Sequence, residues 1–185
     1  MATVVVPFRA ESAKQRLTPA PEDIRAALAQ AMLEDVLSAA NAVATNVLVA
    51  SESGGQGAAV ETALRRVDSS PVLVVNADLP CVRPRDLLTL LGALPEDGIA
   101  LVPAADGTTN ALALAATHLF APLYGPGSVE RFLARAARLE APAAVAKIPN
   151  LADDVDTLAD LERLEGRVGP RTRAALEELR TGLAR

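Results

Sequence analysis

The sequence is poor in aromatic residues and has no long apolar run. Phe, Trp and Tyr make up 2% of the 185 residues, with no tryptophan, so the chain cannot build the stacking platforms that hold single-stranded nucleic acid. Its basic residues are dispersed in a chain of net charge −5, and no basic stripe indicates a nucleic-acid surface. No apolar segment approaches the roughly 20 residues that a membrane-spanning helix needs. We therefore expect a protein that binds neither nucleic acid nor membrane.

Cysteine is equally scarce. The single cysteine, Cys81, excludes a disulfide within the chain, and no signal peptide is evident, so the sequence predicts a cytoplasmic protein. The chain is 50% hydrophobic, which suits one α/β domain with a full core, whereas two domains would each be small. The prediction is one domain over residues 1–185, with a peripheral amphipathic helix at about 170–184 that carries no visible chemistry.

The segment 72–80 joins a buried strand to an acidic loop. Residues 72–75 are apolar and rich in β-branched side chains without alternation, which is typical of a strand covered on both faces of a parallel sheet. Asp78 follows where such a strand opens into the ligand crevice of α/β folds, and Pro80 stops further strand pairing. Asp78 is therefore a candidate metal ligand that needs partners elsewhere in the chain. The alternative is an aspartate in a turn or a helix cap.

Other apolar segments alternate with amphipathic ones along the chain. Further strands are predicted at 3–7, 47–50, 99–103 and 143–148, with an added strand at 111–114 that could run antiparallel. Helices are predicted around residues 24–37, 60–67, 84–92, 128–136 and 158–164. This alternation is typical of an α/β fold with a mostly parallel sheet.

The loop after the first strand contains several basic residues. Residues 8–17 carry three basic side chains at the end of the sheet where α/β folds bind ligands. Among these, Lys14 and Arg16 are the pair predicted to face a triphosphate. The alternative is a solvated loop, which is the more common role of isolated basic residues.

A glycine-rich link, residues 51–57, joins the strand at 47–50 to the next helix. Such a link lets backbone N–H groups approach a phosphate or a base. It also raises a dinucleotide-binding alternative, in which Asp78 would contact the ribose. Against that alternative, Val60 takes the place of the third glycine, and the fingerprint belongs after the first strand.

Two further loops carry hydroxyl groups. Thr109 lies in a polar turn between two apolar strands, where it could donate a hydrogen bond to an anion, although a simple β-turn explains the same residues. Ser128 begins a helix after Gly125 and Gly127. It could simply cap that helix, or the exposed N–H groups of the helix start could bind a phosphate or a carboxylate.

Asp154 and Asp156 form the last acidic pair of interest. In an extended segment they face the same side, while Val155 faces the core. Two carboxylates on one face repel each other unless a cation lies between them or water screens them. The alternative is a helix entry capped by Asp156 or Thr157, and both descriptions can hold together.

Taken in order, these loops resemble the guanylyltransferases that activate a small phosphorylated acid in coenzyme F420 biosynthesis, known as 2-phospho-L-lactate or phosphoenolpyruvate guanylyltransferases. The matching segments are 6–7 with 13–17, 77–80, 107–112, 124–128, and 154–157 with 160–161. They span nearly the whole chain to residue 161, and their occurrence in one order is difficult to obtain by chance.

The resemblance implies a three-layer, GT-A-like nucleotidyltransferase fold, related to the Rossmann fold, with a mixed, mostly parallel sheet and helices on both faces. It also implies a Mg²⁺-dependent transfer of GMP from GTP to phosphoenolpyruvate, 2-phospho-L-lactate or 3-phosphoglycerate, with release of pyrophosphate. The residues implied for the metal site are Asp78, Asp154 and Asp156. Those implied for the phosphorylated acid are Thr109, Gly125 and Ser128. Those implied in catalysis are Lys14, Arg16 and Asp78.

The sequence departs from the family pattern at four places. Arg9 replaces a lysine, Gln56 and Gly57 replace Leu-Asn, and Leu158 replaces a proline. A fourth departure is Glu130-Arg131, which lies where a histidine is common. A non-catalytic nucleotide-binding module and a nucleotidyltransferase of other specificity therefore stay as alternatives, with a dinucleotide-dependent oxidoreductase less favoured. Phosphoenolpyruvate is the preferred acceptor because the arginine- and alanine-rich composition suggests the bacterial branch. A homodimer, and transfer of the product directly to the next enzyme of the pathway, are both compatible with the sequence.

Overall fold

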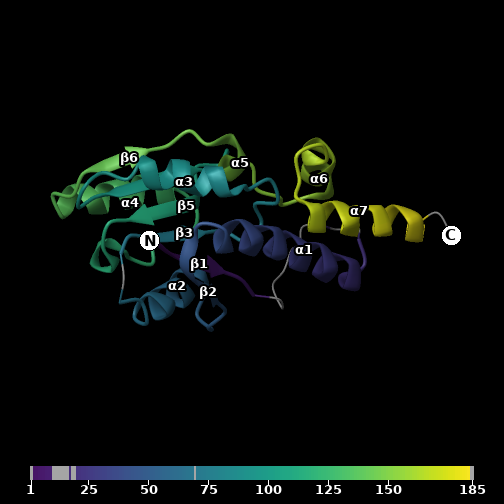
Figure 1. Ribbon diagram of the computed structural model, residues 1–185, viewed down its shortest axis with the longest axis horizontal. Helices are drawn as coiled ribbons and strands as arrows, with labels where there is room; N and C mark the ends of the chain where they lie inside the picture. The colour runs from purple at the N-terminus through teal and green to yellow at the C-terminus, as the bar shows by residue number, and fades with distance from the viewer. Residues whose placement is uncertain (1, 10–16, 18–19, 69, 184–185) are drawn as a thin grey trace.

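A six-stranded sheet forms the centre of the computed structural model, which describes residues 2–9, 17, 20–68 and 70–183 (Figure 1). The strands are β1 (Ala2–Pro7), β2 (Ala44–Ala50), β3 (Val72–Val75), β4 (Ile99–Pro103), β5 (Thr109–Leu114) and β6 (Ala143–Val145). Their order across the sheet is β2-β1-β3-β5-β4-β6. Strand β5 runs antiparallel to β3 and β4, and the other neighbouring strands are parallel. The mixed, mostly parallel sheet and the antiparallel strand at 111–114 are confirmed.

Helices cover both faces of this sheet. On one face, α1 (Glu22–Asn41), α3 (Pro84–Gly92) and α5 (Pro149–Ala152) pack against side chains such as Val4 and Val6. On the other face, α2 (Gln56–Leu64) and α4 (Ser128–Arg138) pack against Val5. Successive strand residues point to opposite faces, so the apolar strands supply both cores at once. The predicted three-layer α/β fold is therefore confirmed.

The register of β4 and β5 contains an irregularity. Val102 pairs with Ala111, but the next residue, Pro103, pairs with Thr109, so Asn110 is left over on the β5 side. An extra residue of this kind is a β-bulge, which changes the direction of the side chains beyond it.

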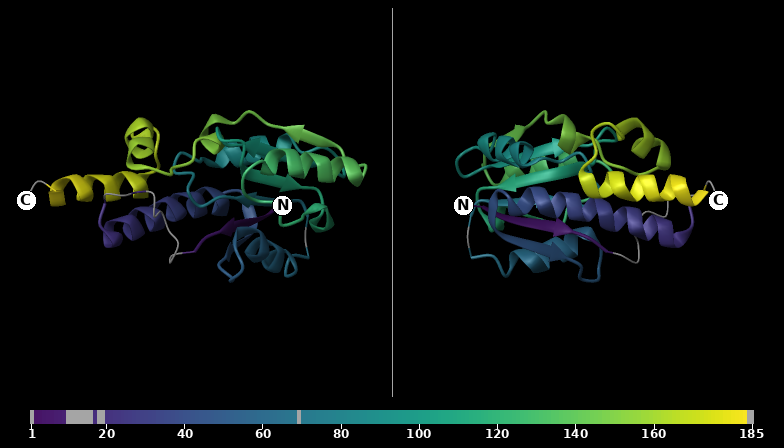
Figure 2. Two further views of the ribbon diagram at one scale, coloured as in Figure 1. Left: turned by 180° about the vertical axis from the view of Figure 1, so that it is seen from behind. Right: turned by 45° about the vertical axis from the view of Figure 1, so that its right-hand side comes forward.

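A third apolar cluster lies beside the sheet, where α6 (Leu158–Leu164) and α7 (Pro170–Leu183) meet α1. Met32 of α1 is fully buried there with Leu161 and Leu176. Helix α7 runs alongside α1 in both views of Figure 2. A helix is thus observed where one was expected at 170–184, while the one-domain organisation stays a prediction.

A buried carboxylate fixes the start of α7 to α1. Asp35 is only 4% exposed, and its carboxylate accepts hydrogen bonds from the backbone N–H groups of Arg171 (3.1 Å) and Thr172 (2.9 Å) and from the Thr172 hydroxyl (2.7 Å). These are N–H groups that have no partner within the helix, and a negative charge at this end is favourable. Gly169 lets the start of α7 approach α1 closely, because a Cβ at position 169 would lie 2.3 Å from the Asp35 Cγ atom.

The last strand is shorter than predicted. A strand was expected at 143–148, but β6 ends at Val145 because the chain turns into α5, which begins at Pro149. Ile148 still contributes to the core as a buried side chain. Among the helices that the structure describes, none is both long and apolar enough to cross a membrane.

Candidate active site

Three aspartates from two distant segments meet at the carboxyl edge of β3. Asp78 lies in the loop after β3, whereas Asp154 and Asp156 lie between α5 and α6. One carboxylate oxygen of each lies within 4.8 Å of the others, and all three residues are half-buried. The backbone N–H of Val155 donates a 3.1 Å hydrogen bond to the carbonyl oxygen of Asp78, and the Val155 side chain is buried. The segment therefore has the arrangement expected of an extended chain, with its acidic side chains on one side and Val155 in the core.

The charges of these aspartates act on one another. Burial raises the pKa of Asp154, the negative charge of Asp78 raises it further, and a hydrogen bond with the Asn110 side chain opposes both effects. Carboxylates held this close repel each other, and a bound cation relieves that repulsion. Carboxylate oxygens are the ligands that hard divalent cations such as Mg²⁺ prefer. The donor set therefore fits a divalent cation.

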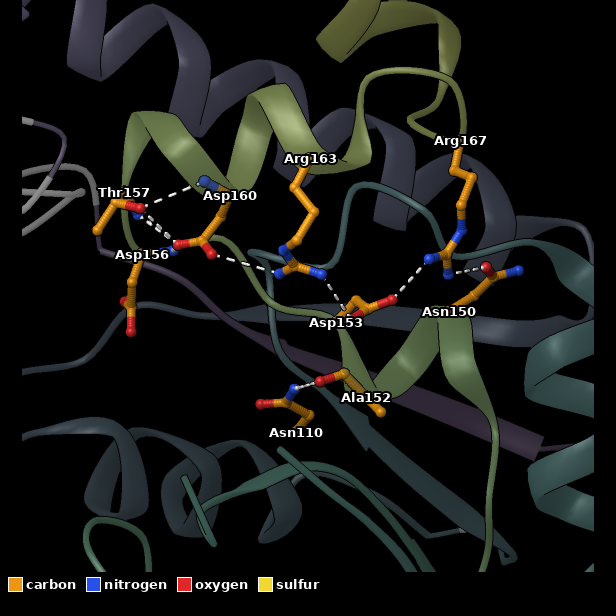
Figure 3. A network of polar contacts seen from close by, with 9 residues as sticks. All are labelled: Asn110, Asn150, Ala152, Asp153, Asp156, Thr157, Asp160, Arg163 and Arg167. Atoms are coloured by element: carbon orange, nitrogen blue, oxygen red, sulfur yellow. Dashed lines mark hydrogen bonds and ion pairs between the residues drawn. The ribbon is translucent and has the colours of Figure 1, made fainter. Parts of the chain in front are cut away.

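Two arginines hold the residue that precedes Asp154 (Figure 3). The Asp153 carboxylate accepts hydrogen bonds from Arg163 Nη1 at 3.1 Å and from Arg167 Nη1 at 2.7 Å. Arg167 also donates to the side-chain oxygen of Asn150 at 2.8 Å. Because both carboxylate oxygens of Asp153 are engaged, the start of the acidic segment is fixed in place.

Asp160 holds the other end of the same segment. Its Oδ2 atom accepts hydrogen bonds from the backbone N–H groups of Asp156 (3.2 Å) and Thr157 (2.9 Å). Burial acts to raise the pKa of Asp160, but hydrogen bonds from Thr157, Arg163 and the Asp156 N–H together outweigh it, so the pKa is lowered. Thr157, rather than Asp156, is the N-cap of α6. Since Arg163 contacts Asp160 (3.3 Å) as well as Asp153, one guanidinium group connects both ends (Figure 3).

We expect Arg163→Gln to weaken divalent-cation binding by about tenfold, as is typical when a residue that orients a ligand is lost. The loss should be partial, since Arg167 still holds Asp153. Mn²⁺ binding, followed by electron paramagnetic resonance without nucleotide, measures the effect. Arg65→Gln is the matched control, because it removes an exposed arginine that pairs with Glu61 on α2. Equal Mn²⁺ affinity in the two variants would contradict the positioning role of Arg163.

The predicted acceptor residues come together at the start of α4. The Ser128 hydroxyl donates a 3.0 Å hydrogen bond to the Thr109 hydroxyl, and the Ser128 N–H donates to the carbonyl oxygen of Gly125 at 3.0 Å. Thr109 and Ser128 are 1% and 0% exposed, so their hydroxyls fix the turn before α4 to β5. The N-cap residue is Gly127, with a φ of 68° that favours glycine. The alternative in which Ser128 caps the helix is therefore wrong.

Arg131 braces the same turn, which the sequence did not predict. Its guanidinium group donates to the carbonyl oxygens of Leu123 (2.8 Å from Nη2), Tyr124 (3.0 Å) and Pro126. Three carbonyl oxygens turned toward one cation make the turn rigid. Bonds to backbone carbonyls leave no signature in the sequence, and an arginine in the first turn of a helix gives no signal for them.

Side-chain amides connect the glycine-rich link to the acidic segment. Gln56 Nε2 donates to Asn76 Oδ1 at 2.7 Å, and the Asn76 N–H donates to the Asn110 carbonyl oxygen at 3.0 Å. Asn110 Nδ2 in turn donates to the Ala152 carbonyl oxygen at 3.2 Å (Figure 3). These amides were not predicted as site residues, although two of them directly follow or begin strands at the same edge of the sheet. Lys14 and Arg16 lie outside the described residues, so their predicted role stays a prediction.

Comparison with known proteins places this arrangement in a family. Residues 9–180 match the model of the MobA-like NTP transferase domain. The chain belongs to the MobA-like NTP transferase family. As a member of this family it is a nucleotidyltransferase, and the dinucleotide-dependent oxidoreductase alternative is wrong. Gly57 is needed for packing, because a Cβ there would lie 2.7 Å from the Pro122 Cβ atom.

Curated relatives give a closer match. The nucleotidyltransferase is 35% identical to the phosphoenolpyruvate guanylyltransferase of Streptomyces scabiei (strain 87.22), with 96% of each chain covered. It is 31% identical to the 2-phospho-L-lactate guanylyltransferase of Natrialba magadii, over 85% of this chain and 80% of that relative. The resemblance seen in the sequence is therefore confirmed.

A solved structure supports the fold. A protein from Desulfovibrio desulfuricans G20, described as a nucleotide-diphospho-sugar transferase, superposes with a TM-score of 0.71 over 96% of this chain and 94% of that chain. At 16% sequence identity this likeness concerns the fold alone.

Proposed function

We propose that the chain is a guanylyltransferase that joins GMP from GTP to phosphoenolpyruvate and releases pyrophosphate, as a step of coenzyme F420 biosynthesis. The closely related acids 2-phospho-L-lactate and 3-phosphoglycerate are the other acceptors. The observation that carries the proposal is the meeting of Asp78, Asp154 and Asp156 at one edge of the sheet, since transfer between phosphates requires neutralisation of concentrated negative charge. The name of the Streptomyces relative supports guanine as the base and phosphoenolpyruvate as the acceptor.

Asp78, Asp154 and Asp156 would hold Mg²⁺ in this proposal. The ion would neutralise charge on the triphosphate and orient it. The chain's own contribution is to keep three carboxylates together despite their repulsion. It does so through the Val155 to Asp78 hydrogen bond and through the Asp153 and Asp160 contacts that hold the acidic segment at both ends.

The reaction needs positioning more than acid–base chemistry. An oxygen of the acceptor phosphate forms a bond to the α-phosphorus of GTP, while the bond from that phosphorus to the bridging oxygen of the β-phosphate breaks, and pyrophosphate leaves. The attacking phosphate is already an anion at neutral pH, so no protein base has to remove a proton. The residues contribute by bringing the two phosphates into line.

The turn before α4, with Gly125 and Ser128, and the adjoining Thr109 of β5 form the proposed acceptor site. The start of α4 supplies N–H groups and a positive dipole end, both of which favour a phosphate or a carboxylate. Its rigid conformation, braced by Arg131, limits the reorganisation needed on binding. Lys14 and Arg16 are proposed to steady the triphosphate and the leaving pyrophosphate.

A nucleotidyltransferase of other base specificity is the second candidate. Gln56 stands where the resembling guanylyltransferases carry a leucine, and its amide is bonded to Asn76 at the glycine-rich link. A different side chain at this link would present different groups to a base.

A substrate panel tests nucleotide and acceptor together. Purified protein with Mg²⁺ is given each of the four NTPs with each phosphorylated acid, and products are identified by mass spectrometry. We expect a GMP adduct of phosphoenolpyruvate to dominate, and we expect its formation to stop when a chelator is added. Adducts with another nucleotide would favour the second candidate. Nucleotide binding without any product would instead favour a non-catalytic binding module.

A further inference from the structure

A separate pocket lies behind the loop that carries Asp78. It has a volume of about 390 Å³ and is bounded by α1, the start of α3 and the link from α6 to α7. Its lining comes from residues 35–42, 81–84 and 167–173, so it does not include the three aspartates of the candidate active site. The volume suits a small-molecule ligand.

The lining of this pocket is cationic in an acidic chain. Arg83, Arg167 and Arg173 line it, against the single carboxylate of Asp35. That carboxylate is already engaged by the start of α7, with three hydrogen bonds of 2.7 to 3.1 Å. Within the described part of the chain, neither Arg83 nor Arg173 forms an ion pair. Arg167 is paired with Asp153 at 2.7 Å, so the positive charge that no ion pair neutralises comes from Arg83 and Arg173.

Three other residues of the lining are Cys81, Pro84 and Pro170. Burial raises the pKa of the Cys81 thiol; the positive charge of Arg167 opposes that effect, the negative charge of Asp153 adds to it, and Arg163 and Arg83 oppose it more weakly. Pro84 and Pro170, the first residues of α3 and α7, also line the pocket.

We propose that this pocket binds a small phosphate ester or a similar multivalent anion, at a site distinct from the one that performs the transfer. Guanidinium groups suit such a ligand because their planar N–H donors match the oxygens of a phosphate. Arg83 and Arg173 form no ion pair within the described residues, although Arg173 Nη2 donates a 3.4 Å hydrogen bond to the Val168 carbonyl oxygen. Arg167 is shared with the acidic segment through its 2.7 Å contact with Asp153.

A bound anion could affect the active site through Arg167, because this residue lines the pocket and also contacts Asp153. An anion that draws Arg167 away from Asp153 loosens one end of the segment that carries Asp154 and Asp156. We therefore expect the anion to lower turnover. This coupling rests on the proposed function, whereas binding of the anion to the pocket does not.

Inorganic phosphate is the probe that tests binding, by calorimetry on the full chain without nucleotide or divalent cation. We expect saturable binding that weakens by about tenfold in Arg83→Gln and in Arg173→Gln, as for loss of one charged hydrogen-bond donor. Arg138→Gln is the matched control, because Arg138 is an exposed arginine on α4, away from the pocket. Its phosphate affinity should equal that of the unchanged protein. Circular dichroism checks that each variant is folded.

Two outcomes would overturn the proposal. Phosphate affinity that is the same in all three variants means that the anion binds elsewhere, and absence of saturable binding means that the pocket holds no anion. In the mass-spectrometric assay, added phosphate should inhibit the unchanged protein and Arg138→Gln more strongly than Arg173→Gln. Equal inhibition of the unchanged protein, Arg138→Gln and Arg173→Gln would contradict the coupling but not the binding of phosphate to the pocket. Failure of the proposed function and failure of the proposed pocket are therefore distinguishable.

Discussion

Replacing Asp78 by asparagine is expected to reduce turnover by about 1,000-fold, which corresponds to about 4 kcal/mol of activation free energy. Asparagine keeps the size of the side chain but removes the negative charge that a divalent cation requires. The fold should survive, because the hydrogen bond that links the two acidic segments uses the Asp78 carbonyl oxygen and not its side chain. Product formation with GTP and phosphoenolpyruvate measures the rate, and Mn²⁺ binding measures the loss of the cation directly.

Asp97→Asn is the control for this change. It removes the same charge from an exposed residue in the turn before β4. This turn lies at the edge of the sheet opposite to the one that carries Asp78. Asp97 has a φ of 54°, a conformation that asparagine also tolerates, so no strain is added. Turnover in this variant should be unchanged. Near-normal activity in Asp78→Asn would remove Asp78 from the metal site.

Replacing Gly169 by alanine is expected to lower the free energy of unfolding by about 3 kcal/mol, a large effect of overpacking. The new Cβ atom would lie 2.3 Å from Asp35 Cγ and 2.5 Å from Oδ1, so Asp35 or the start of α7 has to move. Any such movement weakens the hydrogen bonds that Asp35 accepts from Arg171 and Thr172, and Thr172 is fully buried. A buried polar group that loses its partner adds to the cost.

Gly166→Ala separates this clash from the general effect of removing a glycine. Gly166 lies three residues earlier, and a Cβ there would meet no atom within 4 Å. Urea unfolding of both variants, monitored by circular dichroism, should show a lower midpoint for Gly169→Ala only. Equal midpoints would mean that the contact of α7 with Asp35 adjusts without loss.

The sequence predicted those features that depend on local pattern. The apolar segment 72–75 coincides with β3 because continuous burial on both faces of a sheet permits few polar residues. The side-by-side placement of Asp154 and Asp156 followed from the two-residue period of an extended chain. The convergence of both with Asp78 was expected only from the resemblance, since no local rule brings together residues that are so far apart in the chain.

The features that escaped prediction depend on contacts between distant segments. Asp35 lies on α1, yet its partners are Arg171 and Thr172 at the start of α7. Arg163 and Arg167 are four residues apart, which suggests a shared surface but not that the partner is Asp153. Such contacts are set by how whole helices pack, and a single sequence contains no periodicity that reports them.

The bulge between β4 and β5 decides which partner each of two adjacent side chains meets. Ala111 packs on the face covered by α1, so regular alternation would turn Asn110 toward α4 and Thr109 toward α5. The left-over residue reverses this: Thr109 reaches Ser128 of α4, and Asn110 reaches Ala152 of α5. Deleting one residue from the hairpin, so that the β4–β5 pairing becomes regular, would exchange the partners of these two side chains. The Asn110 amide would then face the turn before α4, and the Thr109 hydroxyl would face the acidic segment. The chemistry at this edge of the sheet thus depends on one extra residue in β5 as much as on which side chains the strand carries.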